Sequence, residues 1–316
     1  MVIITALMIV GLLFAPLQKF GSFESNLPLS QETTSDDLVC YSYDFSEKET
    51  ATFESYDLSY CGWDSSITSI TTEEMNPRSE NVVDFEYSKP KSSVSYEDNH
   101  IPVNQSFNFK VDAIVAVHTY KSNGSGFFIR ENIVMTSAHV LVDSNGNIGR
   151  PIITTLLVNE DGRENFVSEK VIIPKKYNYS TKNADYDWAL IKFRENVGSS
   201  YGSLGTITNF NFNKQQLTSY GYFGENTRLY RASSLGCYKN SEKVAEAYYY
   251  TDHGMSGGPV IAWQNNRSYV VGINHGGLIV SKLFKEGLVS VTTKIPNQVN
   301  QMIRLLEMKD DYETDE

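Results

Sequence analysis

Short apolar runs separated by turn-forming residues dominate the chain from residue 110 onward. Such runs, rich in Val, Ile, Tyr and Phe and bounded by Gly, Asn, Asp and Pro, are typical of β-strands. So many short strands with few helical periods favour an all-β fold built on a barrel or a pair of barrels. The pattern predicts twelve strands, at Ala113–Tyr120, Gly126–Ile129, Ile133–Thr136, Ile152–Val158, Lys170–Ile173, Trp188–Phe193, Leu217–Tyr222, Arg228–Ala232, Val244–Tyr250, Val260–Trp263, Tyr269–Asn274 and Leu288–Thr292.

One helix is predicted at Pro296–Glu307. Its apolar residues Val299, Met302, Ile303 and Leu306 are three and four positions apart, so they share one face. A proline suits the first turn of a helix, where its missing N–H has no intrahelical partner. The chain then ends in an acidic tail, residues 309–316.

The N-terminal segment, residues 1–21, contains one apolar run, Val2–Leu17. The run is short for a membrane span and resembles the core of a secretory signal peptide, although no Lys or Arg precedes it. We therefore expect a secreted protein, with an uncleaved membrane anchor as the alternative. Four Asn-x-Ser sequons are compatible with glycosylation on that route, at Asn104, Asn123, Asn178 and Asn266.

The net charge of −11 is concentrated in residues 22–91, which hold 15 Asp and Glu against 4 Lys and Arg. This acidic segment has no sustained period, so it is predicted to be a largely irregular linker or a propeptide. A processing cut near Lys91, where the composition changes, is one hypothesis. Residues 92–316 are nearly neutral, with 23 acidic and 22 basic residues. Neither part has the basic surface that nucleic-acid binding requires.

Three cysteines, Cys40, Cys61 and Cys237, are too few for a disulfide framework. Cys40 and Cys61 could close a loop and leave Cys237 alone. No cluster of His, Asp or Glu has the sequence spacing of metal ligands, so no metal or cofactor is expected. The body must therefore be held together by its apolar core, for which 41% hydrophobic residues are ample.

The chemistry of the chain is predicted at Thr251-Asp-His-Gly-Met-Ser-Gly-Gly-Pro-Val260. Ser256 lies among glycines just before an apolar strand. A serine hydroxyl is a poor nucleophile, so it needs a base and donors for the oxyanion that forms. Gly254 allows a turn in which its own N–H and that of Ser256 point at one spot. If Ser256 is the nucleophile, the chain must supply a histidine and a carboxylate elsewhere.

His139, in Met135-Thr-Ser-Ala-His-Val140, is the candidate base among five histidines. This motif, with Gly124-Ser-Gly-Phe-Phe-Ile129 one hairpin earlier, resembles the general-base motif of trypsin-like serine proteases. The same resemblance assigns the carboxylate to Asp187, directly before an apolar strand, with Asp185 as the alternative. The order His139, Asp187, Ser256, with gaps of 48 and 69 residues, agrees with that family.

The resemblance covers residues 92–308 and implies two packed six-stranded antiparallel β-barrels, a catalytic cleft between them and a C-terminal helix. It also implies a Ser/His/Asp triad with Gly254 and Ser256 as the oxyanion hole, and a protein or peptide substrate. A monomer is expected, without stable membrane association unless the N-terminal apolar run is retained. Val140 and Met255 depart from the mammalian digestive enzymes, which place a disulfide cysteine and an ion-pairing aspartate there.

The closer resemblance is to the cysteine-poor, glutamyl-endopeptidase-like branch. Gly221-Tyr-Phe-Gly224, Thr251 and Gly272-Ile-Asn-His-Gly-Gly277 support it. In that branch a hydroxyl residue and a histidine read an acidic substrate side chain. Thr251, Asn274, His275 and Gly276 are therefore the expected substrate-binding residues.

Acidic specificity is only suggested, because the branch's histidine position aligns with Asn274 and His275 comes one place later. A one-residue shift along a strand turns a side chain to the opposite face. A trypsin-like preference is disfavoured, because Tyr249 and Tyr250 stand where a pocket-floor aspartate would be needed.

Two alternatives remain open. An HtrA-like housekeeping protease shares several of these motifs but carries a peptide-binding domain after the final helix. A catalytically silent protease homologue could act as a binding module through the acidic segment, although no triad residue is missing here.

Overall fold

The computed structural model describes residues 39–45, 52–57, 101–102, 111–156, 163–208, 210–212, 216–222, 229–235, 237, 239–247, 249, 251, 253–264, 267–279 and 288–308. The chain divides into two units, residues 1–33 and residues 34–316, and all described residues belong to the second. The predicted signal segment, the proposed cut near Lys91 and the acidic tail lie outside the described residues. None of the helices in the described part has the length and apolar character needed to cross a bilayer.

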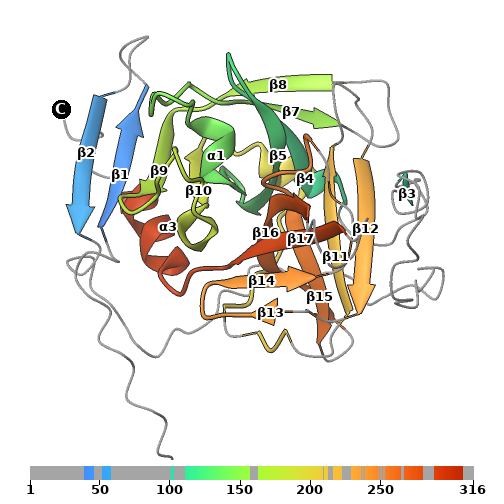
Figure 1. Ribbon diagram of the computed structural model, residues 1–316. Coiled ribbons are helices and arrows are strands. Elements are labelled where there is room, and N and C mark those ends of the chain that lie inside the picture. Colours follow the sequence, from blue (N-terminus) through green and yellow to red (C-terminus); the bar gives the residue numbers. More distant parts are fainter. Residues whose placement is uncertain are drawn as a thin grey trace, which may run out of the picture. The chain divides into compact units, whose positions relative to one another are not determined.

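The first sheet has nine antiparallel strands in the order β2-β1-β9-β10-β6-β5-β4-β7-β8 (Figure 1). Its strands are β1 (Val39–Asp44), β2 (Thr52–Asp57), β4 (Ile114–His118), β5 (Asn123–Arg130), β6 (Ile133–Thr136), β7 (Ile152–Leu156), β8 (Arg163–Val167), β9 (Lys170–Pro174) and β10 (Ala189–Lys192).

The second sheet has eight strands in the order β13-β14-β17-β16-β15-β11-β12-β3, again with antiparallel neighbours. Its strands are β3 (Ile101–Pro102), β11 (Gln216–Tyr222), β12 (Leu229–Leu235), β13 (Lys239–Asn240), β14 (Val244–Ala247), β15 (Pro259–Gln264), β16 (Arg267–Ile279) and β17 (Leu288–Lys294).

All twelve predicted strands correspond to observed strands, which confirms the mostly β fold. The resemblance implied six strands in each barrel, and the observed sheets contain more. The additional strands are β1, β2 and β8 in the first sheet and β3 and β13 in the second. These strands are polar, very short, or come from the acidic N-terminal segment, so the hydrophobic pattern did not reveal them.

The hairpin of β1 and β2 shows that the acidic segment is not irregular throughout. Strand β1 pairs with the edge of β9, with Cys40 opposite Pro174 and Asp44 opposite Lys170. Cys40 and Phe45 are buried in the same core cluster as the first sheet. The Phe45 N–H also donates to the Glu169 oxygen at 2.8 Å. Part of the predicted linker or propeptide is therefore integrated into the fold.

The helices are short apart from the predicted one at the C-terminus. They are η4 (Val111–Ala113), α1 (Ala138–Leu141), η5 (Ala184–Tyr186), α2 (Gly198–Tyr201) and α3 (Val299–Met308). The apolar face of α3 packs into the main core through Val299, Met302, Ile303 and Leu306. The buried Lys192 on β10 donates from Nζ to the Leu306 oxygen at 2.8 Å. This bond satisfies a carbonyl near the helix end that has no intrahelical partner.

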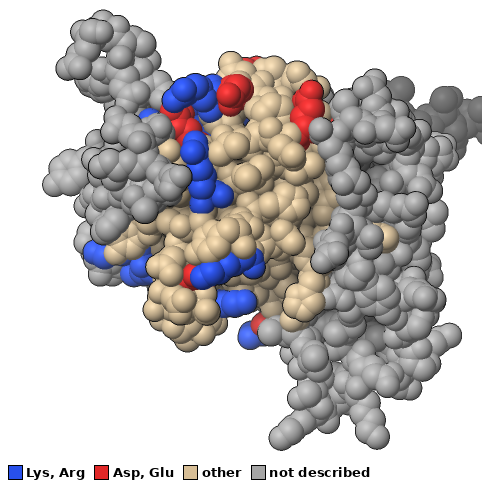
Figure 2. Space-filling view, turned by 90° about the horizontal axis from the view of Figure 1, so that it is seen from above, with Lys and Arg blue, Asp and Glu red and all other residues tan. Residues whose placement is uncertain are grey.

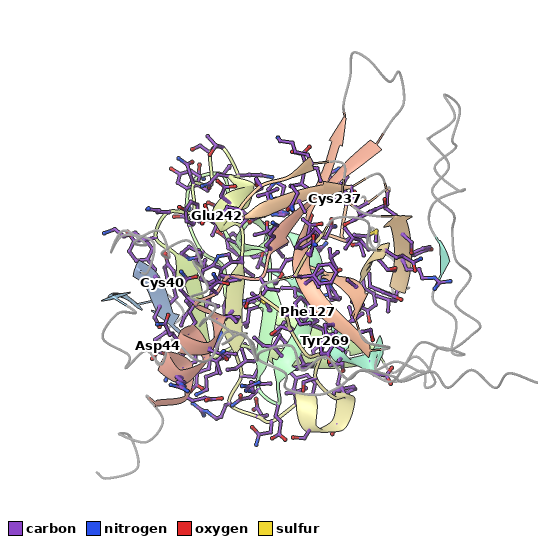
Figure 3. The ribbon with its side chains drawn as sticks, turned by 90° about the horizontal axis from the view of Figure 1, so that it is seen from below. Cys40, Asp44, Phe127, Cys237, Glu242 and Tyr269 are labelled. Carbon is purple, nitrogen blue, oxygen red and sulfur yellow. The ribbon has the colours of Figure 1, made fainter. Side chains whose placement is uncertain are left out.

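The two sheets share one core, because the main apolar cluster includes residues of both. Tyr222 on β11 donates its hydroxyl hydrogen bond to the Ile114 oxygen on β4, at 3.0 Å. A smaller cluster around Phe212, Leu217 and Val260 lies within the second sheet. Cys40 and Cys237 lie far apart in the molecule (Figure 3), and neither forms a disulfide with another described residue. Cys61, the proposed partner of Cys40, lies outside the described residues.

Candidate active site

The loop that carries Ser256 is fixed by hydrogen bonds from both sheets. The hydroxyl of Ser125 on β5 donates to the Gly254 oxygen at 2.6 Å, and the Ser125 N–H donates to the Ser256 oxygen at 2.7 Å. On the other side, the Gly257 N–H donates to the Asn274 oxygen at 2.8 Å. Within the described part of the chain, the N–H groups of Gly254 and Ser256 have no acceptor. Both are thus available to a ligand.

At Gly257 the loop that carries Ser256 packs tightly against the first sheet. Its φ of +86° is a conformation that residues with a side chain rarely adopt. A Cβ atom at this position would lie 2.2 Å from both the Ser125 oxygen and the Thr136 Oγ1. Only glycine therefore allows the serine loop to approach the end of β6, from which His139 follows.

Strand pairing brings His139 and Asp187 together. In the pair β6–β10, Thr136 lies opposite Ala189, so residues just after Thr136 and just before Ala189 meet at the same edge. The Asp187 Oδ1 accepts the main-chain N–H of His139 at 2.8 Å, and Oδ2 accepts the imidazole Nδ1–H at 2.6 Å. Asp185, the alternative carboxylate, lies in η5 and is exposed. The structure therefore pairs His139 with Asp187.

Asp187 is completely buried, yet it is held in its ionised form. Burial alone would raise its pKa, but the charges and hydrogen bonds of His139 and His275 outweigh that effect and lower the pKa well below its usual range. With Nδ1 of His139 donating to this carboxylate, the other ring nitrogen is left free to accept a proton.

The contact between His275 and Asp187 was not predicted from the sequence. The pairing of β16 with β17 shifts between Asn274, opposite Thr292, and Gly276, opposite Val291. His275 is the extra residue of this β-bulge, and a bulge redirects the side chain that it carries. Its Nδ1 donates to Oδ2 of Asp187, the oxygen that also accepts from His139. The two imidazole rings stand edge to face with their centroids 5.4 Å apart.

Ser256 joins this group through the main chain of His275. Its hydroxyl, which is partly buried, donates to the His275 oxygen at 3.4 Å. No hydrogen bond joins the Ser256 hydroxyl to His139 in the described structure. Catalytic hydrogen bonds are often long or absent without substrate and tighten only in the complex. The three predicted triad residues thus lie around one cluster, with the serine hydroxyl turned toward His275.

Of the expected specificity residues, His275 belongs to this cluster and Gly276 adjoins Ser256. Thr251 is buried and shares a hydrogen bond of 2.7 Å with the hydroxyl of Ser290 on β17. Asn274 has no exposed surface, and neither its amide nitrogen nor its amide oxygen has a partner among the described residues. Gly276 leaves the space beside Ser256 open, because a Cβ there would be 4.0 Å from the serine Oγ. Tyr250 lies outside the described residues.

The buried Tyr249 hydroxyl shares a hydrogen bond of 3.0 Å with Thr292 on β17. Burial raises the pKa of Tyr249 to about 12. Ser290 Oγ also donates to the Tyr249 oxygen at 2.8 Å. The side of the cluster near Thr251 is therefore lined by uncharged hydroxyl groups.

The same cluster is the only group of potential metal ligands among the described residues. Ligand atoms of His139, Asp187 and His275 lie within 4.8 Å of one another. The distance from His139 Nδ1 to Asp187 Oδ2, 2.6 Å, is that of a charge-assisted hydrogen bond. Two ligands of one tetrahedral zinc ion, each about 2.0–2.2 Å from it, would lie about 3.3 Å or more apart. The observed geometry is that of hydrogen bonding.

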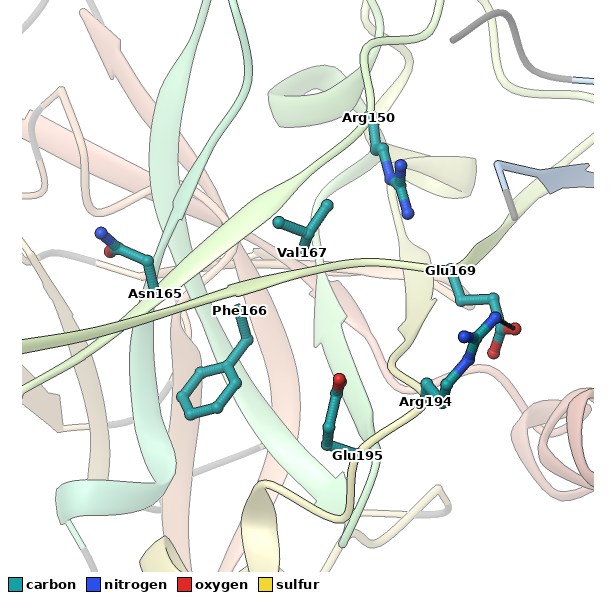
Figure 4. A pocket seen from close by; sticks show the side chains of 7 residues that line it. All are labelled: Arg150, Asn165, Phe166, Val167, Glu169, Arg194 and Glu195. Atoms are coloured by element: carbon teal, nitrogen blue, oxygen red, sulfur yellow. Dashed lines mark hydrogen bonds and ion pairs between the residues drawn. The ribbon is translucent and has the colours of Figure 1, made fainter. Parts of the chain in front are cut away.

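Charged side chains of both signs lie on the described surface of the molecule (Figure 2). On the face shown in Figure 2, Lys and Arg side chains lie among Asp and Glu around a broad uncharged area. A separate hollow involves Arg150, Glu169 and Arg194, together with Asn165, Phe166, Val167 and Glu195 (Figure 4). There Arg194 pairs with Glu169 at 3.3 Å, and Arg150 donates to the Ser168 oxygen at 2.7 Å. This hollow shares no residue with the serine cluster and contains no nucleophile.

The comparisons with known proteins agree with this arrangement. The family described as Trypsin matches residues 103–302, more than half of the chain. The chain belongs to the trypsin family. It is accordingly a serine endopeptidase, an enzyme whose substrates are proteins or peptides. No curated protein matches it. The match begins at residue 103, so β1, β2 and β3 precede the part that the family describes.

Solved structures of proteases resemble this chain at low sequence identity. A structure of a "Glu endopeptidase in complex with MPD" is 17% identical with a TM-score of 0.54, covering 66% of this chain and 97% of that one. The protease Anisep from Arthrobacter nicotinovorans is 17% identical with a TM-score of 0.48, covering 58% of this chain and 90% of that one. The first likeness supports the trypsin fold with its two curled antiparallel sheets.

Proposed function

We propose that this trypsin-family protein is a secreted serine endopeptidase in which Ser256, His139 and Asp187 carry out acyl transfer to water. The observation that carries the proposal is the pair of hydrogen bonds from His139 to the buried Asp187, beside a serine loop with two unused N–H groups. The carboxylate fixes the imidazole in the tautomer that can accept a proton from Ser256. A rotation of the serine hydroxyl from the His275 oxygen toward His139 completes the arrangement.

In the proposed reaction the Ser256 oxygen attacks the substrate carbonyl carbon, and its proton passes to His139. The carbonyl oxygen becomes an oxyanion, which the N–H groups of Gly254 and Ser256 stabilise by about 3–4 kcal/mol per donor. His139 then gives its proton to the leaving amine. Water enters, His139 takes a proton from it, and hydrolysis of the acyl-enzyme regenerates the Ser256 hydroxyl.

For specificity we propose a preference for an acidic residue before the scissile bond. The buried amide of Asn274 has no hydrogen-bond partner among the described residues, and an unsatisfied buried polar group is costly, so a substrate carboxylate would satisfy it. Thr251 and its hydrogen-bonded neighbour Ser290 offer hydroxyl groups on the same side. Gly276 leaves room for the side chain to enter. Among the solved structures of this fold, one is named a Glu endopeptidase.

We infer passage through a secretory pathway from the apolar N-terminal run, with membrane anchorage through that run as the alternative. Two of the four sequons, Asn123 and Asn178, lie at exposed positions, where glycosylation is sterically possible. A monomer is proposed, with protein or peptide substrates as the partners.

The second candidate is a catalytically silent homologue that binds a partner. It is favoured by one observation, the Ser256 hydroxyl bonded to the His275 oxygen rather than to His139. An HtrA-like enzyme has no specific support in the structure.

A peptide library incubated with the purified protein tests the proposed function. We expect cleavage predominantly after Glu or Asp, abolished by Ser256→Ala. Asn274→Leu should reduce cleavage after acidic residues more than it reduces labelling of Ser256 by a fluorophosphonate. Cleavage that persists in Ser256→Ala would refute the assignment, and a lack of cleavage together with a lack of labelling would favour the silent homologue.

A further inference from the structure

The Asp187 carboxylate receives hydrogen bonds from two histidine side chains, and the proposed mechanism uses only one of them. Its Oδ1 accepts the His139 N–H, and its Oδ2 accepts both the His139 Nδ1–H and the His275 Nδ1–H. Because Asp187 has no exposed surface, protein donors must satisfy its charge. His275 thus supplies one of the three donors found among the described residues.

The bulge in β16 is what places the second imidazole there. In a regular strand, successive side chains point to opposite faces. The extra residue after Asn274 interrupts this alternation, and the His275 side chain is directed toward Asp187. The His275 side chain is held in turn by the cluster, since it is only 15% exposed and packs against the His139 ring. The arrangement is therefore built into the backbone and does not depend on a mobile surface side chain.

We propose that His275 is a positioning residue, whose imidazole orients the Asp187 carboxylate and so fixes the tautomer and direction of His139. This inference rests on the proposed function and deepens it. A carboxylate that accepts two N–H groups on one oxygen and one on the other is confined in all directions. Loss of one donor leaves a buried charge partly unsatisfied and lets the carboxylate turn away from His139.

The charge that His275 stabilises is that of Asp187. Burial alone would raise the pKa of this carboxyl, but the hydrogen bonds and charges of His139 and His275 lower it well below its usual range. Tyr177 stays neutral, because burial, with a smaller contribution from the charge of Asp187, raises its pKa far above the usual value. His275 is therefore one of the two side chains that keep the Asp187 carboxylate ionised beside His139.

Two substitutions at position 275 and one control substitution at position 118 separate positioning from mere packing. His275→Leu removes the donor, whereas His275→Asn keeps an amide N–H close to the position of Nδ1. His118→Asn is the matched control, because His118 on β4 hydrogen-bonds to Asn123 Oδ1 and not to a carboxylate. Steady-state kinetics on a cleaved peptide give kcat and KM for each variant, and thermal unfolding shows whether the variant is folded. Labelling of the wild-type protein by a fluorophosphonate is measured first.

We expect His275→Leu to lower kcat by about 10- to 150-fold, the range for one hydrogen bond to a charged group, with KM little changed. His275→Asn should recover most of kcat, because its amide N–H can donate to Asp187 in place of the imidazole. Wild-type kcat in His275→Leu would overturn the proposal. So would a loss of kcat of about 10-fold or more in a folded His275→Asn variant, a result that remains informative even if the leucine variant does not fold. A wild type that is not labelled refutes the proposed function instead.

Discussion

The hydroxyl of Ser125 on β5 of the first sheet donates a hydrogen bond, 2.6 Å long, to the main-chain oxygen of Gly254, which lies in the loop before β15 of the second sheet. The same hydroxyl accepts the N–H of Tyr222 at 2.8 Å. The buried Ser125 side chain of the first sheet thus fixes both the loop that carries Gly254 and Ser256 and strand β11 of the second sheet. The active site depends on this junction as much as on the residues proposed to react.

Replacement of Ser125 by Ala should weaken both the fold and the reaction. The substitution leaves the Tyr222 N–H and the Gly254 oxygen without their partner, at a cost of about 1–3 kcal/mol for a buried group. Ser219→Ala is the control, because that serine is also buried but its hydroxyl has no partner among the described residues. Chemical unfolding and kcat measure the effect. Equal losses in the two variants would contradict the role of Ser125.

Gly257→Ala should abolish activity, because the added Cβ would lie 2.2 Å from two atoms of the first sheet. The rigid backbone of Ser125 cannot move away without opening the junction between the sheets. Gly146→Ala is a matched control with a similar φ of +82°, where the Cβ would meet the exposed side chain of Tyr179. That variant should lose about 1 kcal/mol of stability and keep its activity. An active Gly257→Ala enzyme would show that the loop approaches the first sheet differently.

Phe45→Ala tests whether the N-terminal hairpin belongs to the folded enzyme. Phe45 is buried in the main core, so the substitution should cost about 3–5 kcal/mol in the free energy of unfolding. Tyr41→Ala, at a half-buried position of β1, should cost less. The measurement is thermal unfolding of the enzyme after any natural processing. If the mature enzyme lacks residues 39–57, or if the two variants unfold alike, the hairpin is a removable propeptide.

The buried thiol of Cys40 should make the folded protein less stable at alkaline pH. Burial raises the pKa of its thiol from 9.0 to about 12. Because the folded-state pKa lies above the unfolded one, the contribution of Cys40 is complete below about pH 9 and is lost as the pH rises toward 12. Between pH 9 and 10 the unfolding free energy of the wild type should fall more steeply than that of Cys40→Ala, by up to about 1.4 kcal/mol per pH unit. Urea unfolding under reducing conditions checks this, and identical slopes would contradict it.

The hydrophobic pattern predicted six strands of each sheet and the helix α3, because buried strands and an amphipathic helix leave strong periodic signals. It missed the β1–β2 hairpin, since Val39, Tyr41 and Tyr43 lie in an acidic segment whose overall composition is not typical of strands. It also missed β8, whose Arg-Glu-Asn sequence suits an exposed edge. Edge strands need little burial, so their sequences carry little information.

The pairing of His139 with Asp187 could be predicted because each residue adjoins a strand of the same pair, β6–β10. The contact of His275 with Asp187 could not. It depends on the bulge after Asn274, and a single extra residue leaves no mark in the hydrophobic pattern. The same bulge leaves Asn274 buried in the strand ladder and turns His275 to the carboxylate.

The most direct test of the account is reaction of the purified protein with a fluorophosphonate, followed by mapping of the modified residue by mass spectrometry. The account predicts one covalent adduct, on Ser256, which His139→Ala reduces strongly and which prior denaturation abolishes. An unmodified Ser256 in a folded, fully processed protein, or an equal reaction in His139→Ala, would contradict it.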